Sequence, residues 1–236
     1  HPFEKWSQED YYGFEAFYSR VGQKPGPLPG NNSPKIIYHQ RGTAQSTNIK
    51  TGQPVKPTGL GSEPLELSPE EDPRQALVDW MAAEDNPFFA KALANRYWKH
   101  FFGRGLVDPE DDMRVTNPAT NPELLDALAK HFIDSQFDMK DLIRTICTSQ
   151  TYQLSAIPNE WNQDDKQNFS RYFPKRLHAE VLLDSIDKLT LSQSRFSGVP
   201  QGTTAVALPD NAFNSYFLTV CGRPEAASAC ECERSS

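Results

Sequence analysis

The chain has 236 residues, of which 37% are hydrophobic and 19 are proline, and its formal net charge is −7. The acidic balance argues against a nucleic-acid partner, because proteins that bind a phosphate backbone usually carry a basic face. No apolar run approaches the roughly 18 residues that a membrane helix needs. The length suits one large domain, or one domain with part of another.

The first predicted element is a helix from about Gln8 to Val21, which Ser7 can cap. Gly22 and Pro25 end it. We interpret residues 1–24 as the end of an upstream domain. Apolar side chains recur there at the three- and four-residue spacing of a helix: Tyr11, Phe14, Phe17, Tyr18 and Val21.

Residues 25–72 are rich in Pro, Gly, Ser, Thr and Asn, a composition that predicts an extended connector. The run Lys35–His39 (KIIYH) is typical of a strand, and Gln53–Thr58 is a candidate partner for it in a small β-hairpin.

A helical body is predicted from residue 73 onwards. Asp72-Pro73 and Asn86-Pro87 each place a cap before a proline at the first helical position, and the second of these helices should reach Phe102, before Gly103. On a helical wheel, the solvent-facing side of this helix (its wet face) carries Lys91, Asn95 and Lys99. Its apolar arc comprises Phe89, Ala90, Leu93, Ala94, Tyr97 and Phe101.

Three more helices follow. Asn121-Pro122 begins one, Asp138 with Asp141 resembles a capping box for the next, and a further helix is expected over 177–191. Residues 192–221 resemble a long loop. The side chains expected to face inward are Leu124, Leu125, Leu128, Phe132, Ile133, Met139, Leu142, Ile143, Ile146, Leu182, Leu183, Ile186 and Leu189.

These patterns predict a mainly α fold with a Pro-rich extended connector and one small β-hairpin. Each helix cap stabilises by about 1 kcal/mol, whereas burying each Leu, Ile or Phe contributes roughly 1.5–3 kcal/mol. The packing of apolar stripes should therefore dominate the stability of the helical body.

Six ordered segments resemble a known family: HPFEKWSQEDYYGFEAFYSRVG, NPFFAKALANRYWKHFFGRGLVDPEDDM, NPELLDALAKHF, LIRTICTSQTYQLS, FPKRLHAEVLLDSI and GRPEAASACECERSS. The chain is similar to the planctomycete cytochrome-associated proteins of unknown function that carry PSCyt and PSD domains. Residues 1–24 resemble the end of the cytochrome-like domain. Residues 73–236 resemble most of the PSD domain, truncated at its C-terminus, so we expect the chain to be a fragment of a longer protein.

The resemblance implies a haem-binding Cys-x-x-Cys-His run just upstream of His1. It therefore implies no cofactor in this fragment and haem c in the full-length protein, with His1 as a remote candidate for contact with that haem. It also implies an exported, extracytoplasmic protein, periplasmic or secreted, whose partners include the other domains of the same polypeptide. Protein or polysaccharide partners stay open.

His100 is the most interesting single residue, because it falls on the apolar arc with Arg96 one turn before it. A buried histidine beside an arginine loses its proton easily, and a neutral imidazole suits metal binding or proton transfer. The favoured interpretation is a core histidine satisfied by a backbone carbonyl or by Asp111 or Asp112, since a second ligand at helical spacing is missing.

Four cysteines are present. Cys221, Cys230 and Cys232 are candidates for a thiolate metal site, but no fourth ligand is near, so a disulfide or buried thiols are favoured. Cys147 falls on an apolar stripe and is interpreted as core filling.

Two further polar groups have structural interpretations. Gly103–Val107 indicates a turn, with Arg104 pairing to Asp111 or Asp112. Glu180, Asp184 and Lys188 suit a solvated helix face with an ion pair.

The sequence leaves two functions open. The leading one is a non-catalytic or accessory helical module of an exported, haem-associated protein, which supports electron transfer or docks partners. The alternative is an extracellular enzyme acting on polymers, with a site near His100, Arg96, Asp112 and Arg176. A nucleophile elbow, a metalloprotease histidine pair and a dinucleotide glycine fingerprint are all missing from the sequence.

Overall fold

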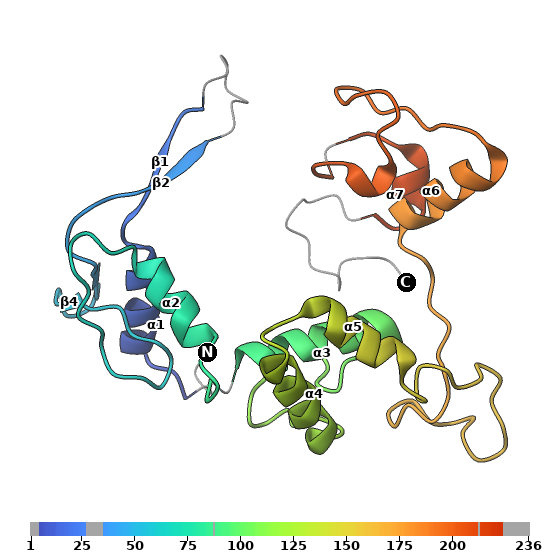
Figure 1. Cartoon of the computed structure of the whole chain (residues 1–236), viewed down its shortest axis with the longest axis horizontal. Coiled ribbons are helices and arrows are strands. Elements are labelled where there is room, and N and C mark those ends of the chain that lie inside the picture. The colour runs from blue at the N-terminus through green and yellow to red at the C-terminus, as the bar shows by residue number, and fades with distance from the viewer. Residues whose placement is uncertain (1–4, 27–34, 87, 212, 224–236) are drawn as a thin grey trace. The chain divides into compact units, whose positions relative to one another are not determined.

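The structure is a computed structural model, and it describes residues 5–26, 35–86, 88–211 and 213–223. These ranges contain seven α-helices and two small antiparallel sheets of two strands each. Figure 1 draws them along the chain. The predicted fold, mainly α with a small hairpin, is confirmed. The chain divides into two compact units, residues 1–172 and 173–236, and each is described by itself.

The first unit begins with helix α1 (Gln8–Glu15), which Ser7 caps as predicted. The Ser7 hydroxyl accepts from the Asp10 N–H at 3.2 Å, and the Asp10 carboxylate accepts from the Ser7 N–H at 2.6 Å. The prediction that this helix reaches Val21 is wrong. A 3₁₀ turn, η1 (Ala16–Tyr18), ends it, and strand β1 (Val21–Lys24) follows because these residues pair with another strand.

Strand β2 (Ile36–His39) lies antiparallel to β1, with Val21 opposite His39. The predicted strand at 35–39 is thus confirmed, but the predicted pairing with Gln53–Thr58 is wrong. Instead, β4 (Pro54–Val55) pairs with β3 (Ser46–Thr47).

Helix α2 (Pro73–Met81) starts at the predicted cap, where Asp72 accepts from the Arg74 N–H at 3.0 Å. Arg74 also forms an ion pair with Asp72, and its guanidinium lowers the pKa of that carboxyl to about 2. The buried Arg20 ties β1 to the segment before α2, because its guanidinium donates to the carbonyls of Ser68, at 3.0 Å, and Glu71.

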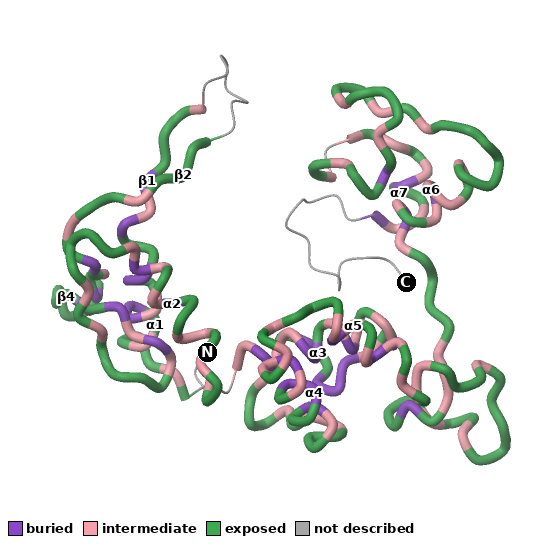
Figure 2. The backbone as a smooth tube through the Cα atoms, viewed as in Figure 1, coloured by how far each residue is buried: buried purple, intermediate pink, exposed green. Residues whose placement is uncertain are grey.

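Three further helices form the main core. They are α3 (Phe89–Phe102), α4 (Pro122–Asp134) and α5 (Met139–Thr148). Asn121 and Asp138 cap α4 and α5 as predicted. The predicted cap of α3 is wrong, because the helix begins at Phe89 with Phe88 as its N-cap. The Asn86 side chain still accepts from the N–H groups of Phe88 and Phe89, both at 2.9 Å. Gly103 ends α3 with φ of 78°. Figure 2 shows buried residues concentrated along these helices. They include Ala90, Ala94, Trp98, Phe102, Leu106, Leu125, Leu128, Phe132, Leu142 and Ile146.

One polar residue of α3 differs from the prediction. Asn95, expected on the wet face, has an exposed fraction of 0%. The segment after Gly103 covers this side of α3, and Asn95 binds it through the backbone of Val107.

The irregular segment after α5 is held by aromatic side chains. Phe169 is buried, and its ring lies 5.4 Å from the centroids of both Trp98 and Phe102. The turn that carries Phe169 is organised by Asp165, whose carboxylate accepts from the N–H groups of Gln167 and Asn168 at 2.9 and 2.8 Å. The hydrogen bond from the Ser170 hydroxyl, together with these backbone bonds, holds the pKa of Asp165 well below its usual value.

The second unit contains α6 (Ala179–Thr190), a 3₁₀ turn η2 (Ala205–Ala207) and α7 (Tyr216–Val220). The predicted loop over 192–221 therefore includes two short helical elements. The buried core of the second unit consists of Ala179, Leu183, Ala205 and Leu218. Of the leucines and isoleucine expected inside α6, Leu183 is buried, whereas Ile186 and Leu189 are 37% and 84% exposed.

Asp184 of α6 has a structural role that its spacing did not suggest. Its carboxylate accepts from the N–H groups of Ala205, at 2.7 Å, and Val206, at 3.0 Å. These two hydrogen bonds fix η2 on α6. The sequence pattern predicts a solvated helix face with an ion pair to Lys188 instead.

Candidate functional site

Two of the four residues proposed for the enzyme site, Arg96 and Asp112, form ion pairs at the segment that connects α3 to α4. Arg96 forms an ion pair with Asp111, and Asp112 forms one with Arg114. The Arg114 guanidinium lowers the pKa of Asp112, so this carboxyl is ionised at neutral pH and is unsuited to act as a general acid.

The other two residues proposed for the enzyme site are His100, on α3, and Arg176. His100 is exposed on α3, one turn after Arg96, and its ring makes an edge contact with the neighbouring Phe101 at 5.0 Å. The expectation that His100 is a buried side chain on the apolar arc is therefore wrong. Arg176 is exposed and belongs to the second unit.

The acids Asp111 and Asp112 line a cavity of about 420 Å³, which we call the Trp6 hollow. Aromatic and aliphatic side chains form much of its wall, and Lys5 lies 4.4 Å from the Trp6 ring centroid. The lining residues are Lys5, Trp6, Leu60, Phe88, Asp111, Asp112, Met113, Arg114, Val115 and Thr116. Of the four residues proposed for an enzyme site, Asp112 lines this hollow. Arg96 is connected to the lining by its ion pair with Asp111.

The aromatic residues of this hollow belong to a longer row of ring contacts. Trp6 and Trp80 lie 5.8 and 6.2 Å from the Phe88 centroid, and Phe14 lies 6.2 Å from Trp80. This aromatic row (Phe14, Trp80, Phe88 and Trp6) joins α1 and α2 to the start of α3. Sequence periodicity could not show it, because each ring comes from a different element.

The segment 103–117 is held by other polar contacts. Asn95 donates to the Val107 carbonyl at 2.8 Å and accepts from the Val107 N–H at 2.9 Å. The buried Glu110 forms an ion pair with Lys99, which lowers the pKa of Glu110. The predicted pairing of Arg104 with Asp111 or Asp112 is wrong, because Arg104 donates to the Lys166 carbonyl at 2.8 Å and lies 3.9 Å from Asp108.

The sequence did not predict a polar cluster between α4 and α5 that consists of His131, Asp141 and Thr145. His131 Nε2 lies 2.8 Å from the Asp141 carboxylate and 3.1 Å from the Thr145 hydroxyl. In a nucleophile–histidine–acid relay the acid and the hydroxyl bind opposite ring nitrogens, whereas here both meet the same one. The cluster thus fits a contact between helices. It also explains why Asp141 does not complete the predicted capping box with Asp138.

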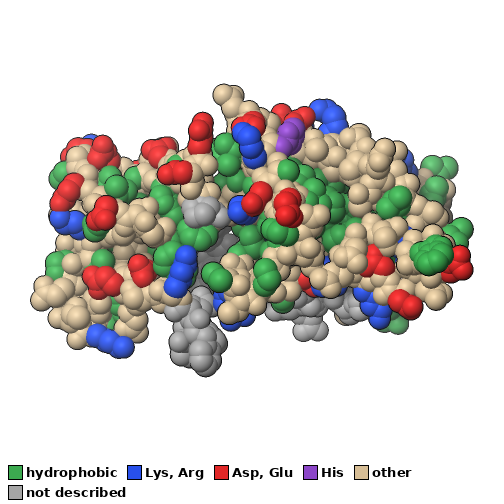
Figure 3. Space-filling model, turned by 90° about the horizontal axis from the view of Figure 1, so that it is seen from below, with side chains coloured by type: hydrophobic (Ala, Val, Ile, Leu, Met, Phe, Trp, Pro, Cys, Tyr) green, Lys and Arg blue, Asp and Glu red, His purple; other side chains and the backbone are tan. Residues whose placement is uncertain are grey.

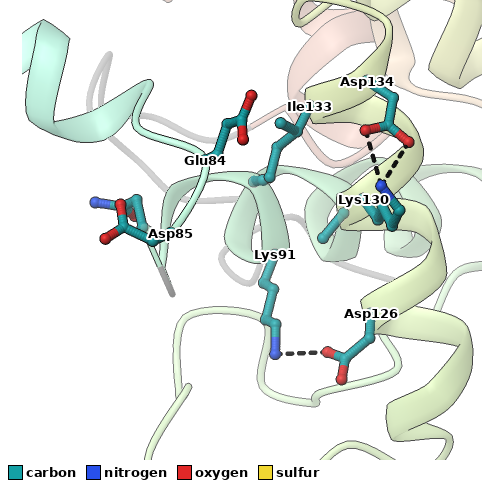
Figure 4. Close-up of a pocket in the computed structure, with 10 residues that line it drawn as sticks. Glu84, Asp85, Lys91, Asp126, Lys130, Ile133 and Asp134 are labelled. Carbon is teal, nitrogen blue, oxygen red and sulfur yellow. Dashed lines mark hydrogen bonds and ion pairs between the residues drawn. The ribbon is translucent and has the colours of Figure 1, made fainter.

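A second hollow, about 360 Å³ in volume, lies between α3 and α4 (Figure 4). Both of its lysines face carboxylates of α4: Lys91 lies 2.5 Å from Asp126, and Lys130 lies 2.9 Å from Asp134. Glu84 and Asp85 come from the connection between α2 and α3 (Figure 4). The positive charges are thus neutralised within the wall. Acidic and basic side chains are also interspersed on the face drawn in Figure 3.

The candidate metal and haem residues are largely beyond what the structure describes. His1, Cys230 and Cys232 lie outside the described residues. Cys221 is half-buried and packs against the core of the second unit, and Cys147 is half-buried; neither forms a disulfide within the described residues. Within the described ranges, three or more His, Cys, Asp or Glu side chains do not gather in a metal-binding group. In the same ranges, none of the helices combines the length and apolarity required to cross a bilayer.

Comparison with known proteins identifies a family. The model of the PSD1 family, described as a protein of unknown function (DUF1553), matches residues 73–212. No curated protein and no solved structure matches the chain. Because the match covers more than half of the sequence, the chain belongs to the PSD1 family of proteins of unknown function.

Proposed function

We propose that this chain is an accessory, non-catalytic helical module that couples the PSD1 domain to the polypeptide preceding it. In this proposal the preceding polypeptide is a haem-associated domain of an exported protein. The module holds that domain in a fixed position for electron transfer or for the docking of partners. The aromatic row is the observation that carries the proposal.

The row supports coupling because of where its residues belong. Trp6 and Phe14 come from the segment that resembles the end of a cytochrome-like domain, whereas Trp80 lies within residues 73–212, the PSD1 match, on α2, and Phe88 lies there just before α3. Aromatic pairs in such geometry each contribute about 0.5–1.5 kcal/mol beyond their area burial. Arg20 adds two hydrogen bonds to the same junction.

The polar side chains of the segment 103–117 support a structural role in the same way. Glu110 and Asp111 pair with cations of α3, Asp112 pairs with Arg114, and Asn95 binds the Val107 backbone. The alternative, an enzyme acting on extracellular polymers, would need His100 to approach Asp112 in the Trp6 hollow. It has less support, because Asp112 is already paired with Arg114.

The haem part of the proposal is tested by absorption spectroscopy. The chain would be expressed together with its natural upstream sequence and haem-maturation machinery, with the 236-residue chain under the same conditions as the control. We expect Soret and α bands in the longer protein and neither band in the control. A longer protein without both bands would contradict the haem-associated function.

A further inference from the structure

The two-stranded ribbon of β1 and β2 exposes apolar side chains on both of its faces (Figure 2). Ile36, Ile37 and Tyr38 follow one another in β2, and adjacent residues of a strand point to opposite faces. A continuous apolar run of this kind is typical of a strand that is covered on both sides. Here the three side chains are 41%, 49% and 39% exposed. The ribbon therefore presents apolar surface to a partner.

The ribbon also lies in a basic part of an otherwise acidic chain. Residues 16–62 contain no Asp or Glu, although the whole chain has a net charge of −7. Lys24 of β1 and Lys35, which precedes β2, are exposed. Lys35 donates to Gln23 Oε1 at 3.2 Å, and the Lys24 ammonium lies 5.6 Å from the Tyr38 ring centroid. Among the described residues, neither lysine forms an ion pair with a carboxylate. We call β1 and β2 together with Lys35 the basic ribbon.

A turn after α5 carries the opposite charge. Its apolar side chains are Trp161 and Ile157, which are 88% and 80% exposed. Glu160 and Asp164 are exposed beside them, and within the described ranges neither carboxylate forms an ion pair. The nearest cation in the sequence is Lys166. We call residues 157–164 the Trp161 turn. Tryptophan is highly buried on average, and exposed tryptophans are enriched among the residues that dominate protein–protein contacts.

The Trp161 turn is held in shape by its own hydrogen bonds. The Asn159 side-chain oxygen accepts from the N–H groups of Trp161 and Asn162, at 2.9 and 3.1 Å. The Asn162 side-chain oxygen accepts from the Asn159 N–H at 2.7 Å, and its amide donates to the Ser170 carbonyl at 3.3 Å. A turn that is already ordered loses little conformational freedom when a partner binds.

We propose that the basic ribbon of one copy of this chain docks on the Trp161 turn of a second copy. The ammonium groups of Lys24 and Lys35 then meet the carboxylates of the turn. The indole face of Trp161 accommodates both a cation and the aliphatic side chains of β2. A ribbon against a ribbon, or a turn against a turn, would place like charges opposite each other, which is unfavourable. The contact therefore joins two different surfaces.

The contact is small and largely electrostatic, so we expect a dissociation constant on the order of 0.1 mM. The net charge of −7 on each copy opposes association at very low salt. The measurement is therefore made at about 0.1 M ionic strength, where the screening length is about 10 Å. The basic ribbon and the Trp161 turn do not include the aromatic row, so the inference stands or falls independently of the accessory function proposed above.

Sedimentation equilibrium of the whole 236-residue chain tests the association. We expect the average mass to rise above 26.6 kDa with protein concentration, and to return towards that value at about 1 M salt, where the screening length is about 3 Å. Trp161→Ala should weaken the association several-fold without changing the charge. Tyr216→Ala, at an aromatic ring that is 86% exposed, is the matched control and should associate as the wild type does.

Charge reversal identifies the two surfaces. The double variants Lys24→Glu with Lys35→Glu and Glu160→Lys with Asp164→Lys should each stay monomeric, because like charges then face each other. An equal mixture of the two should associate again, since the reversed ribbon meets the reversed turn. Misfolded variants would not recover in this way. Lys140→Glu with Lys188→Glu, at exposed lysines, makes the same charge change as the first variant and should still associate.

Three outcomes would overturn the proposal. A wild-type chain that stays at 26.6 kDa at every concentration would exclude the second copy, and its sedimentation with phosphatidylglycerol vesicles would then assign the basic ribbon to a lipid surface. Association that survives either charge reversal would place the contact elsewhere. A mixture of the two reversed variants that stays monomeric would show that ribbon and turn do not meet.

Discussion

Asn95 and Val107 exchange two hydrogen bonds in the interior of the first unit, at 2.8 and 2.9 Å. The amide of one side chain thus satisfies both backbone groups of a residue in the turn after α3. Both residues are buried, at 0% and 4% exposure. This pair fixes the segment that carries Glu110, Asp111 and Asp112.

Replacing Asn95 with Ala should destabilise the protein by about 2–4 kcal/mol, because it leaves a buried N–H and a buried C=O of Val107 unpaired. Denaturant unfolding measures this change. Asn214→Ala, at an exposed position, is the control and should change the free energy of unfolding by less than about 0.5 kcal/mol. Similar values for the two variants would show that the Val107 bonds contribute little.

The two glycines that flank Arg104 should respond differently to substitution. A Cβ on Gly105 would lie 2.2 Å from the Val107 carbonyl oxygen, so the backbone must move, whereas a Cβ on Gly103 meets nothing within 4 Å. Gly103→Ala should cost about 1 kcal/mol, because φ is 78° there. Gly105→Ala should cost clearly more. Thermal unfolding of the two variants compares them, and equal losses would contradict the close approach seen at Gly105.

The ion pair between Glu110 and Lys99 should make stability depend on pH. Lys99 lowers the folded-state pKa of Glu110, so the contribution of the pair is present above the unfolded-state pKa, about 4.3. It is lost as pH falls through the lower folded-state value. Glu110→Gln should therefore destabilise by up to about 3 kcal/mol at pH 7.

The check is the free energy of unfolding of wild type and Glu110→Gln along a pH series. The difference between them should shrink steadily as the solution is made more acidic than the unfolded-state pKa. A difference that stays constant with pH would exclude the ionised carboxylate as its source.

In the second unit, two leucines of α6 form a matched pair. Leu183 is 7% exposed and Leu189 is 84% exposed. Leu183→Ala should cost about 2–5 kcal/mol, as for other buried leucines, and Leu189→Ala less than about 0.5 kcal/mol. Hydrogen exchange of the α6 amides reports the stability of this unit. Comparable acceleration in the two variants would mean that Leu189 is covered in solution.

Much of the fold follows from local signals. The pairs Asp72-Pro73 and Asn121-Pro122, together with Asp138, mark where α2, α4 and α5 start, and Gly103 marks where α3 ends, because caps depend on neighbouring residues alone. The apolar periodicity of α4 likewise identified Leu125, Leu128 and Phe132 as buried.

The wrong predictions concern residues whose burial or secondary structure depends on segments distant in the sequence. Asn95 has the polarity of a surface residue, but the turn after Gly103 covers it. Val21 extends a helical pattern, but pairing with His39 places it in a strand. Ile186 and Leu189 continue an apolar stripe, but the structure leaves their side chains 37% and 84% exposed.

The candidate site was predicted less well than the fold, for the same reason. Arg96 pairs with Asp111, where Arg104 was the expected partner, because the partner of each charge depends on the path of the connection between α3 and α4. The aromatic row has no signature in sequence, since its rings come from separate elements.

The central claim is that the aromatic row couples the N-terminal segment to the PSD1 domain, and hydrogen exchange of the α1 amides in Phe88→Ala tests it most directly. Trp161→Ala, at an exposed ring, is the control. We predict faster exchange in α1 and α2 of Phe88→Ala, with α4 and α5 unchanged and with no effect of Trp161→Ala. Unchanged protection of α1 in Phe88→Ala would contradict the coupling.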